Sequence, residues 1–223
     1  MVNLRSWLVL GITCIAGIAR ADAPSIEGRI AIGVRTSSTS ESNHDPIYDD
    51  TSSVRVAAEG LVGVRFGRAV VGLHGGIATP LRFSSSPQYD SGEVVAETTS
   101  AIYPLDLGLG VQVDVGGGFW VSAWVGATLA FAHASSAAQH ISAIDFTGDI
   151  PATSWSYQTT SLGFGAAVGY DIVRTESGRF SGVVGLDRQG IGPIPIRSNA
   201  GGTGTDPDSL STTSITLGVA YAY

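Results

Sequence analysis

Apolar and polar residues alternate with a period of two along most of this chain. In the last eleven residues, every second position is apolar or aromatic and the intervening positions are small; the apolar set is Ile215, Leu217, Val219, Tyr221 and Tyr223. Because successive side chains of a β-strand point to opposite faces, such a strand has one apolar face and one face of small side chains. A strand of about ten residues is long enough to cross a bilayer as part of a β-barrel, with its aromatic residues at the interface.

Seven earlier segments have the same alternation, so the pattern predicts eight strands in all. The segments are 28–36, 53–66, 69–83, 102–115, 119–131, 160–172 and 180–187. The connections alternate between short (67–68, 116–118, 173–179) and long (37–52, 84–101, 132–159, 188–212). Residues 93–96 and 141–146 also alternate, which indicates that some strands extend beyond the membrane and keeps a ten-stranded sheet as an alternative.

These features predict an all-β fold, a transmembrane antiparallel up-and-down β-barrel. An even number of strands, with short turns at one end and long loops at the other, places both termini in the periplasm and the long loops outside the cell. A soluble lipocalin-like barrel with its apolar face inward is the alternative. Its interior could not hold the many Val, Ile, Leu, Phe and Tyr side chains of the apolar faces, so we expect the apolar face to meet lipid.

The first 21 residues have the features of a secretory signal peptide. Arg5 gives a positive start, residues 7–18 are apolar, and Ala19-Arg20-Ala21 forms a cleavage site. The barrel domain is therefore expected at 22–223. The one cysteine, Cys14, lies in the apolar run, so no disulfide is expected in the mature chain.

The charge of the mature chain argues against nucleic acid as a partner. After residue 21 the chain has ten arginines, no lysine and nineteen acidic residues, a net charge of about −9, and no positive stripe that could follow a phosphate backbone. We expect no cofactor and no metal. The abundance of glycine, 30 of 223 residues, also disfavours a helical protein.

Charged residues on the small-side-chain faces are expected to point into the lumen. In a narrow lumen such charges should pair with one another, and the pairs would form a plug rather than an ion pathway. The predicted luminal network consists of Arg29, Arg35, Arg55, Glu59, Arg65, Arg82, Asp106, Asp114, Asp171 and Asp187.

On these patterns the chain resembles the small eight-stranded outer-membrane barrels of the OmpA and OmpX type over its whole mature length. The C-terminal positions Leu217, Val219, Tyr221 and Tyr223 resemble the signature that the barrel-assembly machinery reads in such proteins. The resemblance implies outer-membrane lipid and lipopolysaccharide as surroundings, a monomer, and a role as structural protein, adhesin, narrow pore or lipid-modifying enzyme.

Two sets of residues are candidates for chemistry. His133 and Ser135 are similar to the His-x-Ser of outer-membrane lipid A deacylases, and Asp145 or Asp149 would orient the histidine in a lipid hydrolase. The aspartates Asp45, Asp49, Asp50, Asp206 and Asp208 could bind Ca²⁺, but they lack a ligand-spaced motif. Solvated acidic loops explain them better.

The sequence therefore favours a non-enzymatic surface barrel, in an envelope-structural role or binding an unidentified extracellular ligand through its Ser/Thr/Asp-rich loops. A small porin or channel is the alternative, and the lipid hydrolase ranks behind both.

Overall fold

The computed structural model describes residues 24–41, 48–50, 54–85, 88–90, 93–95, 98–143, 146–197 and 203–223. The strands are β1 Ser25–Glu41, β2 Tyr48–Asp50, β3 Val54–Phe66, β4 Ala69–Ala78, β5 Leu81–Ser85, β6 Gln88–Asp90, β7 Glu93–Val95, β8 Thr98–Gly116, β9 Phe119–Ser136, β10 Gln139–Ala143, β11 Phe146–Ile150, β12 Thr153–Thr175, β13 Gly178–Arg197 and β14 Thr203–Ala222. In the described part of the chain, no helix is long and apolar enough to cross a membrane.

Eight antiparallel strands close into a ring in the order β1, β3, β4, β8, β9, β12, β13, β14. Each strand pairs with its neighbours in the sequence, and the first and last are joined where the backbone of Tyr223 donates to and accepts from Gly28, at 3.0 and 3.4 Å. The short strand β5 continues β4 along β8, and β2 pairs with β5. The predicted eight-stranded up-and-down barrel is therefore confirmed, and the ten-stranded alternative is wrong.

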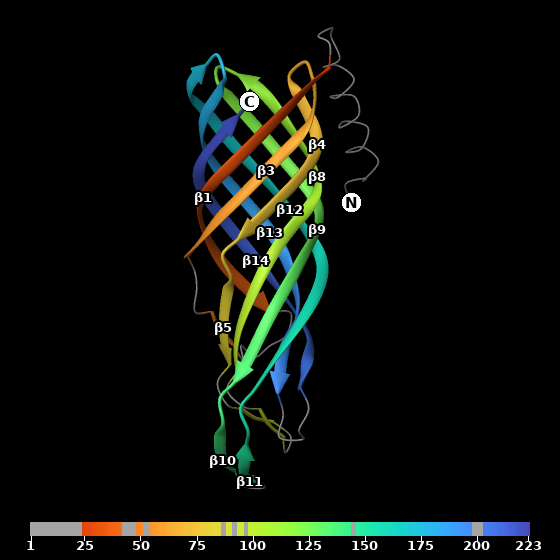
Figure 1. The fold of residues 1–223 in the computed structure, drawn as a ribbon, viewed down its shortest axis with the longest axis vertical. Coiled ribbons are helices and arrows are strands. Elements are labelled where there is room, and N and C mark those ends of the chain that lie inside the picture. The colour runs from red at the N-terminus through yellow and green to blue at the C-terminus, as the bar shows by residue number, and fades with distance from the viewer. Residues whose placement is uncertain are drawn as a thin grey trace, which may run out of the picture.

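Short turns lie at one end of the barrel and long strand extensions at the other (Figure 1). Two-residue turns at 67–68, 117–118 and 176–177 join the strands at what we call the turn end. Gly117 and Gly118 have φ angles of 62° and 91°, values that side-chain-bearing residues rarely adopt. At the opposite end, which we call the far end, β10 and β11 pair as a separate hairpin.

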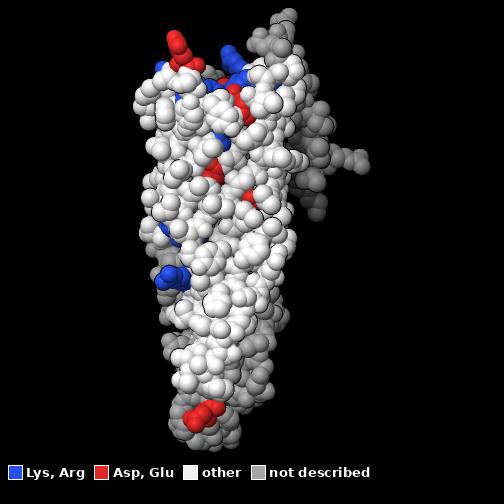
Figure 2. Space-filling view, viewed as in Figure 1, with Lys and Arg blue, Asp and Glu red and all other residues white. Residues whose placement is uncertain are grey.

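The two faces of the wall have opposite polarity, and the apolar face is outside. Large hydrophobic side chains such as Leu73, Leu162 and Val219 are 62–70% exposed, whereas charged and hydroxyl side chains fill much of the buried interior. In Figure 2 charged atoms gather at the turn end, and the wall below it is mostly uncharged, with a few scattered charged groups. This arrangement is the reverse of a soluble protein and matches a wall that faces lipid.

Arg82 lies on the outer face, so its predicted place in the lumen is wrong. Ile77 pairs with Leu105, but Leu81 pairs with Ile102, so the strand that contains Thr79 and Pro80 has one residue more than β8. Proline cannot donate to the ladder, and a shift of one residue exchanges the two faces of a strand. Leu81 and Phe83 are consequently buried while Arg82 is exposed.

Close contact between neighbouring strands requires glycine at several inward positions. On β4, a Cβ atom at Gly72 would overlap with the carbonyl oxygen of Val62 and the Cα of Gly63, whereas a Cβ at Gly75 would find its nearest neighbour at 3.9 Å. The backbones of β3 and β4 can therefore keep their spacing at Gly72 only without a side chain there.

We expect Gly72→Ala to lower the free energy of unfolding by about 1–3 kcal/mol, because the overlapping atoms belong to backbone that must shift. Gly75→Ala on the same strand is the matched control and should change stability by about 0.5 kcal/mol or less. Urea unfolding of the refolded barrel measures both. Equal destabilisation by the two variants would contradict the role of close contact.

Candidate functional site: the barrel lumen

A network at the centre of the lumen is formed by Arg35, Glu59 and Asp187, which we call the central network. The guanidinium of Arg35 lies 3.5 Å from a carboxylate oxygen of Glu59 and 3.2 Å from one of Asp187. The side chains of Arg35 and Asp187 are 2% and 3% exposed. Arg35 also donates to Thr216 Oγ1 at 3.1 Å, and Asp187 accepts from the indole of Trp124 at 3.0 Å. One arginine therefore pairs with two carboxylates, which come from β3 and β13 on either side of β1.

Asp106 lies beside the central network and is held by neutral donors. Its carboxylate accepts from Thr128 Oγ1 at 2.7 Å and from the side-chain amide of Gln189. Asp106 is on β8 and Gln189 is on β13, strands that are not neighbours in the ring. The hydrogen bond from the Gln189 side-chain amide to Asp106 therefore crosses the lumen.

A second network closes the lumen near the turn end, and we call it the rim network. Arg65 and Arg179 each pair with both Glu27 and Asp114, so that positive and negative groups alternate around a small ring. Arg179 lies 2.8 Å from Glu27 and 3.3 Å from Asp114. It also reaches Asp171 at 3.6 Å. These residues come from β1, β3, β8, β12 and β13, so the network spans the full width of the barrel.

Between the two networks, Arg29 lies over the ring of Trp120, with the guanidinium carbon 3.9 Å from the ring centre. This cation–π contact joins β1 to β9 across the lumen. Both residues line a cavity of about 50 Å³, together with His74 and Trp124, whose rings are stacked at 4.4 Å. A cavity of this volume has room for only a few water molecules.

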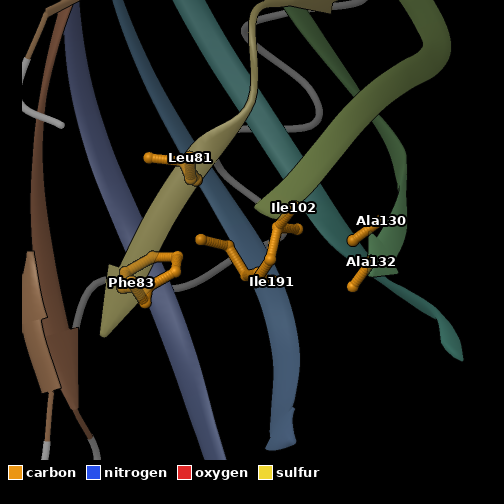
Figure 3. Close-up of a cluster of buried hydrophobic side chains, with 6 residues drawn as sticks. All are labelled: Leu81, Phe83, Ile102, Ala130, Ala132 and Ile191. Carbon is orange, nitrogen blue, oxygen red and sulfur yellow. The ribbon is translucent and has the colours of Figure 1, made fainter. Parts of the chain in front are cut away.

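Towards the far end, the lumen is filled by apolar side chains, which we call the inner apolar cluster (Figure 3). The cluster comes from β5, β8, β9 and β13, and Tyr157 of β12 packs against it; its members are Leu81, Phe83, Ile102, Ala130, Ala132 and Ile191. The change of face at Thr79 and Pro80 is what brings the two β5 side chains inside. Apolar side chains in a narrow lumen exclude water and ions.

Nine of the ten residues of the predicted luminal set lie on the inner face. Six of them belong to or directly join the two networks through ion pairs: Arg35, Glu59, Arg65, Asp114, Asp171 and Asp187. Arg29, Arg55 and Asp106 have other partners, and Arg55 donates to Ser214 Oγ at 3.4 Å. Arg82 is the exception described above.

Sequence reasoning missed Glu27 and Arg179, which bind each other across the rim. Each lies one residue before the start of a predicted strand, at Gly28 and Phe180, although β1 and β13 begin at Ser25 and Gly178. Continuing the alternation by one residue at the start of each strand would have placed both charges on the inner face.

The candidate catalytic residues do not come together as the sequence predicted. His133 and Ser135 are both exposed on the outer face of β9, but the hydroxyl that lies 3.2 Å from His133 Nδ1 belongs to Ser156 of β12. Asp145 is outside the described residues, and Asp149 is exposed. No third group that would orient His133 is therefore part of the described geometry.

The candidate calcium ligands form no recognisable metal site in the described geometry. Asp45 is outside the described residues, Asp49 and Asp50 lie in β2, and Asp206 and Asp208 lie in β14. Within the described residues, no group of three or more His, Cys, Asp or Glu side chains could hold a metal ion.

The four C-terminal residues that resemble an assembly signal lie along the outer face of β14 and directly after it, towards the turn end. Leu217, Val219 and Tyr223 are exposed. Tyr221 packs against Phe180, with ring centres 4.8 Å apart, and donates to the carbonyl of Ser177 at 2.9 Å. Recognition of these side chains by the assembly machinery stays a prediction.

No protein-family model matches this chain, and no curated protein matches its sequence. Solved structures resemble its fold. Ail, the attachment invasion locus protein of Yersinia pestis, in complex with the heparin analogue sucrose octasulfate, is 16% identical over 89% of this chain and 99% of that chain, with a TM-score of 0.50. Another structure of Ail has a TM-score of 0.49 at 15% identity, covering 88% of this chain and 98% of that chain.

The outer-membrane protein OprG from Pseudomonas aeruginosa also resembles this chain, with a TM-score of 0.42 and 13% identity over 92% of this chain and 98% of that chain. At such identities the likeness concerns the fold alone. The resemblance to small outer-membrane barrels that the sequence indicated is confirmed at that level.

Proposed function

We propose that this protein is a non-enzymatic barrel of the bacterial outer membrane that does not conduct and that acts through its long far-end connections or as a structural part of the envelope. The observation that carries this proposal is the occupied lumen. Two ion-pair networks and the inner apolar cluster lie in succession along the barrel axis, and each joins strands that are not neighbours in the ring.

The porin alternative needs a continuous wet path, and the lumen offers little support for it. The cavity between the networks has a volume of only about 50 Å³, and on either side of it arginines are bound to carboxylates. Such buried pairs are expensive to separate, because each charge would be left unpaired in a medium of low polarity. The paired charges of the lumen therefore favour a barrel whose interior is blocked over one that conducts ions.

The outer face supports a membrane-spanning position for this barrel. The exposed apolar side chains cover every strand of the ring, and closure satisfies the backbone hydrogen bonds that lipid cannot satisfy. Under the orientation that we propose, the turn end faces the periplasm and the far end faces the outside. Outer-membrane phospholipid and lipopolysaccharide would then be its immediate surroundings.

Three of the four far-end connections are acidic, which narrows the kind of partner that they could bind. Between residues 37 and 53, 84 and 101, and 132 and 159 the sequence has nine acidic residues and no arginine or lysine. The matched structure of Ail holds a heparin analogue. A polyanion of that kind would be repelled by these acidic segments, so we propose a cationic or uncharged surface partner for this chain.

Heat-modifiable migration tests the architecture. We expect the refolded protein to run on SDS gels at different apparent masses before and after boiling, because a closed barrel resists the detergent until it is heated. The native protein should be recovered in outer-membrane fractions. Identical migration of both samples, or a soluble periplasmic pool, would contradict the proposal.

A further inference from the structure

A cleft of about 530 Å³ opens at the turn end of the barrel. Three turns surround it: residues 116–118 between β8 and β9, the start of the β12–β13 hairpin, and Arg68 between β3 and β4. Part of its lining is charged, with Arg68, Arg174, Arg179, Asp114 and Asp171, and part is apolar, with Phe119, Tyr170 and Ile172. The cleft thus passes from the charged mouth of the lumen to the apolar outer wall.

The charged part of the cleft has more positive than negative groups. Its two carboxylates are already bound: Asp114 by Arg65 and Arg179, and Asp171 by Arg174 at 3.1 Å and by Ser181 at 2.8 Å. Arg174 is nevertheless 61% exposed. Arg68 is exposed, and in the described part of the chain its side chain has neither a hydrogen bond nor an ion pair. Two guanidinium groups are therefore accessible to an anion.

The apolar part of the cleft is at the level where a membrane interface would lie. Phe119 and Tyr170 are neighbours across β9 and β12, with ring centres 4.7 Å apart, and both are about half exposed on the outer wall. Ile172 beside them is 67% exposed. Aromatic side chains mark the boundary between headgroups and hydrocarbon in membrane proteins.

The glycine turn keeps the cleft open. Gly116, Gly117 and Gly118 all have positive φ angles, and a Cβ at either of the first two would meet no atom within 4 Å. Residues with side chains rarely adopt these φ angles, so the turn leaves the space beside the arginines free.

We infer that this cleft binds an anionic glycerophospholipid, with its phosphate at Arg68 and Arg174 and its glycerol and upper acyl chains along Phe119, Tyr170 and Ile172. Guanidinium groups bind phosphate oxygens with paired, charge-assisted hydrogen bonds, and basic pockets at the membrane surface bind anionic lipid headgroups. The inference rests on the membrane-spanning position proposed above, and it adds a specific lipid site to it.

Native mass spectrometry of the detergent-solubilised barrel can test the site, with phosphatidylglycerol and phosphatidylcholine as probes. We expect the wild type to retain phosphatidylglycerol in preference to phosphatidylcholine, and the Arg68→Gln/Arg174→Gln variant to bind phosphatidylglycerol about tenfold more weakly. Arg68→Gln alone should weaken binding without any effect on folding, because the Arg68 side chain has no partner to lose among the residues that the structure describes.

Arg188→Gln is the matched control, because Arg188 is an exposed arginine on the outer wall outside the cleft, where it donates to Ser211 Oγ at 3.4 Å. It should leave lipid binding unchanged. Equal binding by the wild type and the double variant, or an equal loss in Arg188→Gln, would overturn the inference, as would full displacement of the lipid by inorganic phosphate. Heat-modifiable migration of each variant shows separately whether the barrel itself has formed.

Discussion

Replacing Arg35 by alanine is expected to lower the free energy of unfolding by about 3–5 kcal/mol, because it leaves Glu59 and Asp187 as unpaired carboxylates in the lumen. Arg35 is 2% exposed and is the ion-pair partner that these two acids share. Glu59→Ala should cost less, since Arg35 then keeps Asp187 at 3.2 Å. Urea unfolding of the refolded barrel, followed by tryptophan fluorescence, measures these differences.

Two controls separate the loss of charge pairing from the loss of side-chain volume. Arg188→Ala removes an exposed arginine from the outer wall and should change stability by about 0.5 kcal/mol or less. The triple variant Arg35→Met/Glu59→Gln/Asp187→Asn removes all three charges together and should be more stable than Arg35→Ala. If Arg35→Ala and Arg188→Ala were equally stable, the central network would have no structural role.

The wild-type protein is expected to carry no ion current above that of the bare membrane in planar-bilayer recordings. The central network and the inner apolar cluster block the lumen independently, because one binds its charges in pairs and the other excludes water. Phe83→Ala/Ile102→Ala, which opens the apolar cluster, and Arg35→Ala, which opens the central network, should therefore each remain without current. The rim network would still close the lumen in their combination, so a measurable current is expected only when Arg179→Ala is added to open that network as well.

The matched control for this experiment changes side chains of similar size on the outer wall. Phe164→Ala/Leu186→Ala removes two exposed apolar side chains and should add no current when combined with Arg35→Ala/Arg179→Ala, which leaves the inner apolar cluster in place. Large, stable and ion-selective channels in the wild type would contradict the plug, and the porin alternative would then replace the proposed function.

The strands themselves could be predicted from the sequence, because the alternation of side chains along a strand is a local property. Each of the eight predicted segments overlaps a strand of the ring, although 69–83 covers both β4 and β5 and although β12, β13 and β14 extend beyond the predicted bounds; short turns occur at the three predicted connections. The volume argument that places the apolar faces outside also needed only composition and strand number. The lipid-facing pattern of Leu217 and Val219, for example, is readable from the last few residues alone.

The position of Arg82 shows that alternation alone does not predict which face of the wall a side chain is on. Alternation assigns a face only relative to a neighbouring residue, so one extra residue at Thr79 and Pro80 reverses every side chain that follows until the pattern is set again by pairing. Nothing in the local sequence distinguishes Leu81 in lipid from Leu81 in the lumen. The register with β8 decides it, through the pairs Ile77–Leu105 and Leu81–Ile102.

The sequence by itself determined the strands and their apolar and polar faces, and nine of the ten charges that it assigned to the lumen lie there, because these features depend on the period of the chain and on composition. Only the tertiary structure decided which charges meet. Arg179 binds Glu27 across a separation of 152 residues, and Arg35 reaches Asp187 of β13 as well as Glu59 of β3. These partners follow from the closure and register of the ring, which bring charges from distant strands to the same level of a narrow lumen.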